Sequence, residues 1–173
     1  HERLVGSEMC IRDRYAESVK TYSDNLELAT VTMLKGAGDA EDCGNLIKNV
    51  WYNAIYKEKD DETDKYTRLD GYFVSDFNDA LGNLFVDSSF SSKIDSIDKN
   101  QDTVNSLMKK LKNPPEEYKD AYDALSDFYD AYLALTGCAT DPSGSLQTYS
   151  STFNDADTDT LNSYKAMQQY LGD

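Results

Sequence analysis

Residues 90–111 read FSSKIDSIDKNQDTVNSLMKKL and decide the fold expected for this chain. Apolar residues recur in this stretch at alternating intervals of three and four, with Gln101 as the polar exception. The apolar positions are Phe90, Ile94, Ile97, Val104, Met108 and Leu111. This spacing aligns them along one side of an α-helix, as in helices that pack together in a bundle.

The same spacing recurs in other segments of the chain. They cover residues 15–33, 43–55, 77–85, 118–135 and 146–171. No alternating strand pattern of useful length accompanies them. We therefore expect an all-α fold, with residues 15–173 forming one antiparallel helical bundle of about five to six helices and coiled-coil-like packing.

Glycine, proline and charged residues predict where these helices end. Gly36-Ala37-Gly38 is expected to end the first helix, because glycine is costly inside a helix and favoured just past its end. Asp39 would cap the next helix. Gly137 is expected to end the helix over 118–135 in the same way.

Between the second and third expected helices the chain is charged and aperiodic. Residues 57–70 are expected to form an exposed loop, and a frayed helical extension is the alternative. Ser75 would cap the helix that follows. Residues 87–89, Asp-Ser-Ser, would mark a break or kink before the helix over 90–111. Pro114 and Pro115 would separate that helix from the next one, since proline suits a first helical turn.

Composition limits the partners of this chain. It has 173 residues, 17 basic and 32 acidic, and a net charge of -15. Because a surface with this much negative charge repels phosphate backbones, we expect no nucleic-acid partner. No run of 18 apolar residues occurs, so no transmembrane segment is expected.

The first residues form a separate case. Residues 3–14 read RLVGSEMCIRDR. This string resembles a translated sequencing-library adapter over its whole length. The resemblance implies that residues 1–14 are not native and that the natural sequence begins near Tyr15. Excluding them removes the only histidine, His1, together with Cys10.

Few residues remain that could support catalysis. Without histidine, catalytic triads, Cys-His pairs and histidine zinc sites are excluded. Cys43 and Cys138 are too few for a cysteine zinc site, and no phosphate-binding glycine loop is present. We expect no catalytic, cofactor-binding or metal-binding residues, and we expect that the protein is not an enzyme. A hydrolase that uses only carboxylates is the alternative.

Three acidic clusters are candidate cation sites. They are Asp155, Asp157 and Asp159; Asp98, Asn100 and Asp102; and Asp60, Asp61, Glu62 and Asp64. An EF-hand beginning at Asp155 needs glycine and glutamate where Thr160 and Ala166 stand. Solvated helix faces or turns are the favoured interpretation, and a weak cation site is the alternative.

Two further groups leave alternatives open. The first is the aromatic set Tyr118, Tyr122, Phe128, Tyr129 and Tyr132. Packing at helix seams is its favoured role, and a platform for sugars or a partner protein is the alternative. Cys43 and Cys138 are expected to be buried free thiols, or alternatively a disulfide, which would imply an oxidising compartment.

Three stretches carry a loose resemblance to other proteins. They are NVWYNAIY at 49–56, LKNPPEEY at 111–118 and ATDPSGS at 139–145. Residues 15–173 resemble uncharacterised helical surface lipoproteins of Gram-positive gut-type bacteria. The resemblance implies an extracytoplasmic protein with a lipid anchor in a missing N-terminus. We expect a non-enzymatic binding or structural role toward an unknown protein or envelope component. The alternative is a cytoplasmic or phage-associated structural protein that self-assembles.

Overall fold

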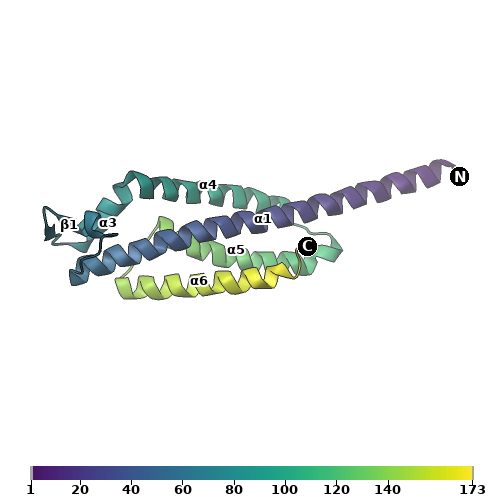
Figure 1. Cartoon of the computed structure of the whole chain (residues 1–173). Coiled ribbons are helices and arrows are strands. Elements are labelled where there is room, and N and C mark those ends of the chain that lie inside the picture. The colour runs from purple at the N-terminus through teal and green to yellow at the C-terminus, as the bar shows by residue number, and fades with distance from the viewer. Residues whose placement is uncertain (1, 173) are drawn as a thin grey trace.

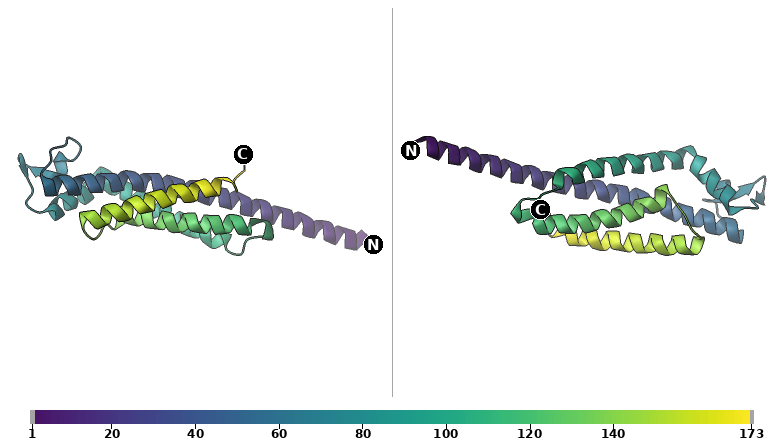
Figure 2. Two further views of the ribbon diagram at one scale, coloured as in Figure 1. Left: turned by 90° about the horizontal axis from the view of Figure 1, so that it is seen from below. Right: turned by 180° about the vertical axis from the view of Figure 1, so that it is seen from behind.

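The chain folds as a long bundle of four helices with a small tip at one end (Figure 1). The computed structural model describes residues 2–172, with side chains described from residue 8 onward. The bundle consists of α1 (Glu2–Tyr56), α4 (Ser88–Leu111), α5 (Lys119–Thr140) and α6 (Leu146–Gln168). Consecutive helices of these four run in opposite directions (Figures 1 and 2). The predicted all-α class is confirmed.

The tip comprises residues 57–87 and is inserted between α1 and α4. It contains α2 (Asp64–Thr67), strands β1 (Arg68–Leu69) and β2 (Tyr72–Phe73), and α3 (Phe77–Val86). The strands form an antiparallel hairpin in which Arg68 pairs with Phe73 and Leu69 with Tyr72. The expectation of a plain loop over residues 57–70 was therefore wrong, since this segment holds α2 and β1.

The apolar stripes predicted from the sequence form the core. The largest fully buried side chains come from all four bundle helices and from α3. They include Leu26, Met33, Ile47, Leu84, Ile97, Leu111, Leu125, Phe128, Tyr132, Leu135, Phe153 and Met167. The polar exception on α4, Gln101, is matched across the α4–α5 seam, where its Nε2 donates to Thr136 Oγ1 at 2.7 Å. A partner thus offsets the cost of placing this amide within a helix seam.

The predicted break at Gly36-Ala37-Gly38 was wrong, because α1 continues through it to Tyr56. A Cβ atom on Gly36 would lie 2.0 Å from Asn100 Oδ1, so this glycine permits close approach of α4. The packing gained outweighs the cost of about 1 kcal/mol for glycine in a helix. Asp39 accordingly lies inside α1 and caps nothing.

Other predicted helix ends had mixed outcomes. Gly137 does not end α5, which continues to Thr140. Asp76, and not Ser75, caps α3, because its side chain accepts from the Asn78 amide at 2.8 Å. The break at Asp87 is confirmed, and its carboxylate caps α4 by accepting from the Phe90 amide. The two prolines lead into a short 3-10 turn, η1 (Glu116–Tyr118), directly before α5.

The N-terminal part of α1 extends beyond the other helices (Figures 1 and 2). Every described side chain from residue 8 to residue 14 is exposed. Among the described side chains, Tyr15 is the first along the chain to make a tertiary hydrogen bond. Its hydroxyl donates to Glu117 Oε1 at 2.6 Å. No helix in the described part of the chain has the length and apolar character needed to cross a bilayer.

Candidate interaction surface at the tip of the bundle

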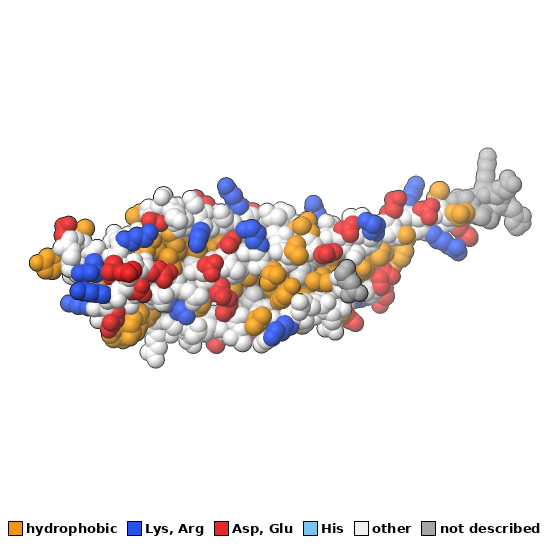
Figure 3. All heavy atoms as spheres, viewed as in Figure 1, with side chains coloured by type: hydrophobic (Ala, Val, Ile, Leu, Met, Phe, Trp, Pro, Cys, Tyr) orange, Lys and Arg blue, Asp and Glu red, His pale blue; other side chains and the backbone are white. Residues whose placement is uncertain are grey.

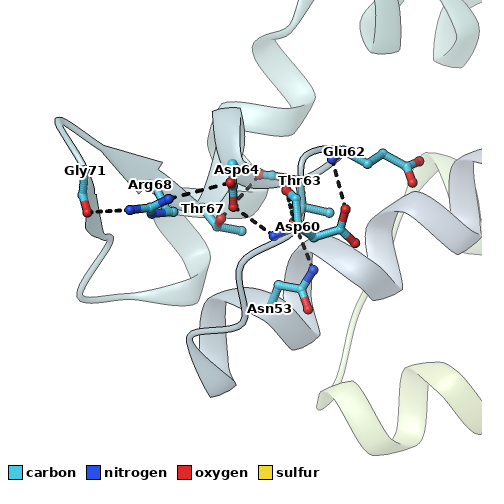
Figure 4. A network of polar contacts seen from close by, with 8 residues as sticks. All are labelled: Asn53, Asp60, Glu62, Thr63, Asp64, Thr67, Arg68 and Gly71. Atoms are coloured by element: carbon cyan, nitrogen blue, oxygen red, sulfur yellow. Dashed lines mark hydrogen bonds and ion pairs between the residues drawn. The ribbon is translucent and has the colours of Figure 1, made fainter.

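The tip lies at the end of the molecule opposite the N-terminus (Figure 1). Its fold depends on a polar network that begins at the end of α1 (Figure 4). Asn53 is 8% exposed, and its Nδ2 donates to Oγ1 of the fully buried Thr63 at 2.9 Å. This bond ties the last turns of α1 to the start of α2. Because both groups are buried, losing one leaves the other without a partner at appreciable cost.

The network continues from Asp60 to the hairpin (Figure 4). Asp60 and Asp64 accept backbone amides, with Glu62 N at 3.0 Å from Asp60 Oδ1 and Asp60 N at 3.0 Å from Asp64 Oδ1. Arg68 then joins α2 to the hairpin. Its guanidinium lies 3.6 Å from Asp64 Oδ2 and donates to the Gly71 carbonyl at 2.8 Å. The Asp60 and Asp64 side chains therefore organise the turns of this segment.

The tip carries three of the most exposed large apolar side chains. Leu69, Tyr72 and Val86, which we call the tip patch, are 71%, 80% and 80% exposed. Leu69 and Tyr72 are directly paired across the hairpin, so their side chains lie on the same face. Leu69 and Val86 line one shallow groove together with Val74 and Gly82. Adjoining exposed apolar side chains that form one patch, and not scattered single ones, are typical of interaction surfaces.

In the part of the chain that the structure describes, neither of the two helical acidic clusters gathers three ligand side chains at one point. Asp155, Asp157 and Asp159 all lie within α6, whose helical backbone directs Asp157 away from the side on which Asp155 and Asp159 lie one turn apart. Asn100 of the second cluster bonds within the protein, since its Nδ2 donates to the Thr32 carbonyl at 2.9 Å. Among the described residues, no three His, Cys, Asp or Glu side chains converge as metal ligands would.

Asp157 instead meets a carboxyl group that the sequence did not single out. This carboxyl group is Glu41. Asp157 and Glu41 line a small apolar groove between α1 and α6 together with Leu34 and Leu161. A side-chain hydrogen bond to Asp157, followed by partial burial and the nearby negative charges, raises the pKa of Glu41 to about 7. The pair therefore shares a proton at mildly acidic pH.

Cys43 and Cys138 are buried free thiols, as favoured from the sequence. Cys43 is 1% exposed on α1, and Cys138 is 7% exposed near the end of α5. Burial raises the pKa of Cys43 to about 11 and also raises that of Cys138. The Tyr149 hydroxyl donates to the Cys138 carbonyl at 2.7 Å and fixes this part of α5 against α6. Thiols in such surroundings react slowly.

The aromatic set on α5 divides between core and surface. Phe128 and Tyr132 are fully buried, as expected for seam packing. The Tyr132 hydroxyl donates to Asn100 Oδ1, and burial raises the Tyr132 pKa. Tyr122 and Tyr129 are only partly buried and line a groove between α4 and α5. Packing at helix seams is therefore confirmed for Phe128 and Tyr132, and Tyr122 and Tyr129 also pack against the core while keeping part of their surface open.

Comparison of the chain with protein-family models, with curated proteins and with solved structures gives no match. The function must therefore be argued from the residues themselves. The tip patch was missed from the sequence because Leu69 and Tyr72 lie in a charged stretch without periodicity. The only available signal was the turn dipeptide Asp70-Gly71, which is typical of a tight hairpin between two short strands.

Proposed function

We propose that this protein is a non-catalytic, extracytoplasmic helical bundle that binds a protein component of the cell envelope through its tip. The observation that carries the proposal is the tip patch, three apolar side chains that are 71–80% exposed. They lie on a hairpin and a helix end held by the Asn53–Arg68 network. Burying such side chains against a partner would contribute about 25 cal/mol per Å² of apolar area.

In this proposal residues 1–14 are foreign to the natural chain, and a lipid anchor precedes Tyr15. The exposure of residues 8–14 supports that boundary, as does the hydrogen bond of Tyr15 to Glu117. From Tyr15 to Tyr56, α1 rises about 60 Å at 1.5 Å per residue. An anchor on the N-terminal side would hold the tip at about that distance from the membrane. The gene upstream of the Tyr15 codon tests this part, since a start codon without a lipobox or secretory segment would contradict it.

Binding to isolated envelopes of a Gram-positive gut bacterium tests the role of the tip. The test variant replaces Leu69, Tyr72 and Val86 with serine, which should cost little stability because all three side chains are exposed. We expect the labelled wild-type chain to bind and the test variant to lose most of that binding. Equal binding of the two chains, with equal circular dichroism spectra, would refute a role for the tip.

A specific observation favours a second candidate function, a cytoplasmic or phage-associated structural protein that self-assembles. Leu28, Val31 and Leu34 of α1 are 40–50% exposed, and Leu161 of α6 is 53% exposed. On the face of the molecule that Figure 3 shows, hydrophobic side chains lie in scattered patches along the bundle. A second copy could cover them, although the net charge of -15 opposes association.

Sedimentation velocity of residues 15–173 separates the two functions. Self-assembly predicts a concentration-dependent oligomer that is lost when Leu28, Val31 and Leu34 become serine and kept in the tip variant. The α1 variant is also the matched control for envelope binding, because it removes as many exposed apolar side chains away from the tip. A chain that stays monomeric at about 100 μM would argue against self-assembly. Its free energy of association would then be weaker than about 6 kcal/mol.

A further inference from the structure

A groove of about 430 Å³ lies between α4 and α5, away from the tip. Its volume falls within the range of small-ligand sites, about 300–1,000 Å³. The lining residues, which we call the tyrosine–lysine groove, are Asn105, Met108, Lys109, Lys112, Tyr122, Ser126, Tyr129 and Asp130. On each helix they recur every three or four residues, so two facing stripes form the walls.

The aromatic wall is partly open to solvent. Tyr122 and Tyr129 are intermediate in exposure, and both line the groove from α5. Met108 is 9% exposed and closes the floor from α4. Tyrosine rings present a flat apolar face with a polar edge, which suits ligands that are themselves apolar on one face and polar at the rim. The C–H face of a pyranose ring has this character.

The polar groups of the groove are positioned to bind hydroxyl groups. The Tyr129 hydroxyl donates to Asn105 Oδ1 at 2.5 Å, which fixes the Asn105 amide across the seam. That bond uses the amide oxygen of a groove-lining residue, and the amide Nδ2 remains a donor. Ser126 and Asp130 add a hydroxyl and a carboxylate from the opposite wall. Donors and acceptors thus converge from both helices.

The charge at this groove is opposite to that of the protein as a whole. Lys109 and Lys112 line it in a chain of net charge -15, and Lys110 lies between them in sequence. Both lining lysines are exposed, and neither has a carboxylate oxygen within 4.0 Å among the described side chains. Lysines favour the C-terminal turn of a helix, which accounts for their position on α4. That preference does not account for two tyrosines that line the same groove.

We propose that the tyrosine–lysine groove binds an acidic saccharide, a sugar that carries carboxylate or sulfate groups. Tyr122 and Tyr129 contact the C–H faces of the sugar rings. Asn105 and Asp130 bind ring hydroxyls as donor and acceptor. Lys109 and Lys112 pair with the acidic group through charge-assisted hydrogen bonds. The site does not depend on the tip, so either proposal can fail without the other.

Titration of the ¹⁵N-labelled full chain with trigalacturonate, followed by nuclear magnetic resonance, tests the proposal. We expect saturable shifts in residues 105–112 and 122–130 at ligand concentrations up to about 10 mM. A heparin-derived tetrasaccharide tests sulfate in place of carboxylate, and maltotriose is the neutral control. Sodium sulfate alone tests whether a simple anion suffices.

Three variants make the result decisive. Lys109→Gln with Lys112→Gln should weaken binding by about fivefold, since two solvent-exposed charge pairs are lost. Tyr129→Leu should weaken binding of the same ligand through loss of its ring. Lys57→Gln with Lys59→Gln makes the same charge change at the tip and should have no effect. Melting temperatures of all variants are compared to exclude unfolding.

Four results would overturn the proposal. The first is no shift with either acidic oligosaccharide at the highest concentration. The second is equal binding of maltotriose, which would remove the requirement for acid. The third is binding of sodium sulfate with the same affinity as the oligosaccharides. The fourth is equal weakening by the tip lysine variant, which would indicate general charge attraction.

Discussion

Alanine substitutions at two glycines of α1 should have opposite effects on stability. A Cβ atom on Gly44 would lie 2.0 Å from Cε2 of Phe153 and within 2.7 Å of two further ring atoms. Phe153 is 2% exposed, so its ring cannot move aside without displacing other core side chains. A Cβ atom on Gly38 would meet nothing within 4 Å. Both residues lie well inside the same helix.

These distances set the expected magnitudes. At Gly38 alanine gains its helical preference with no clash, so Gly38→Ala should stabilise the protein by about 0.5–1 kcal/mol. At Gly44 the same gain is opposed by overpacking, which typically costs 1–3 kcal/mol and should be at least that large for contacts this short. Gly44→Ala should therefore destabilise the protein by about 1–3 kcal/mol. The two variants would differ by about 1.5–4 kcal/mol.

Urea unfolding followed by circular dichroism at 222 nm measures both variants. The midpoints should move in opposite directions with the slope unchanged, because the area exposed on unfolding stays the same. The fluorescence of Trp51, the single tryptophan, gives a second probe of the same transition. If Gly44→Ala stabilises the chain as much as Gly38→Ala does, then α1 and α6 are not packed as closely as described.

Three other perturbations give further tests. The pKa of Glu41 is about 7 in the folded chain, whereas its ordinary value is 4.5. Between these two pH values the folded chain holds a proton that the unfolded chain has released, so the free energy of unfolding should fall as pH rises from about 4.5 through 7. Solvent screening limits this loss of stability to about 1 kcal/mol or less. Glu41→Gln should remove the pH dependence, because glutamine does not titrate. Urea titrations of both chains at pH 5 and pH 8 measure it, and an equal loss in both chains would contradict the pairing of Glu41 with Asp157. Thr63→Val leaves the buried Asn53 amide without its acceptor, so the tip should lose about 1–3 kcal/mol and its amide exchange should accelerate, while unchanged protection would contradict the network. Of the three thiols, the exposed Cys10 should react with Ellman's reagent at once and the two buried thiols only in denaturant; failure of those two to react even then would indicate a disulfide.

The bundle could be predicted from the sequence because its helices follow one rule. Where every third or fourth residue is apolar, as from Phe90 to Leu111, the pattern fixes both the helix and its buried side. Asp87 and the two prolines then mark ends of helices through local chemistry alone. Such signals lie within a few residues of the position they determine, so one sequence contains them.

The errors arose where distant residues decide the local structure. Gly36 was interpreted from its intrinsic preference, but its role is set by Asn100, which is 64 residues away. The hairpin holding Leu69 and Tyr72 has two residues in each strand, too few for a pattern to form. Glu41 and Asp157 meet only because α1 and α6 pack together. No local signal distinguishes these two carboxylates from the other acidic residues of the chain.

The uninterrupted course of α1 has a mechanical consequence. This single helix contacts α3, α4, α5 and α6, so it runs beside every other long element of the fold. A pull applied between its first turns and the tip therefore travels through one continuous rod of backbone hydrogen bonds. Its seams with the neighbouring helices are then loaded in shear and must yield together, not one after another. Such a molecule transmits tension along its axis and does not absorb it by bending.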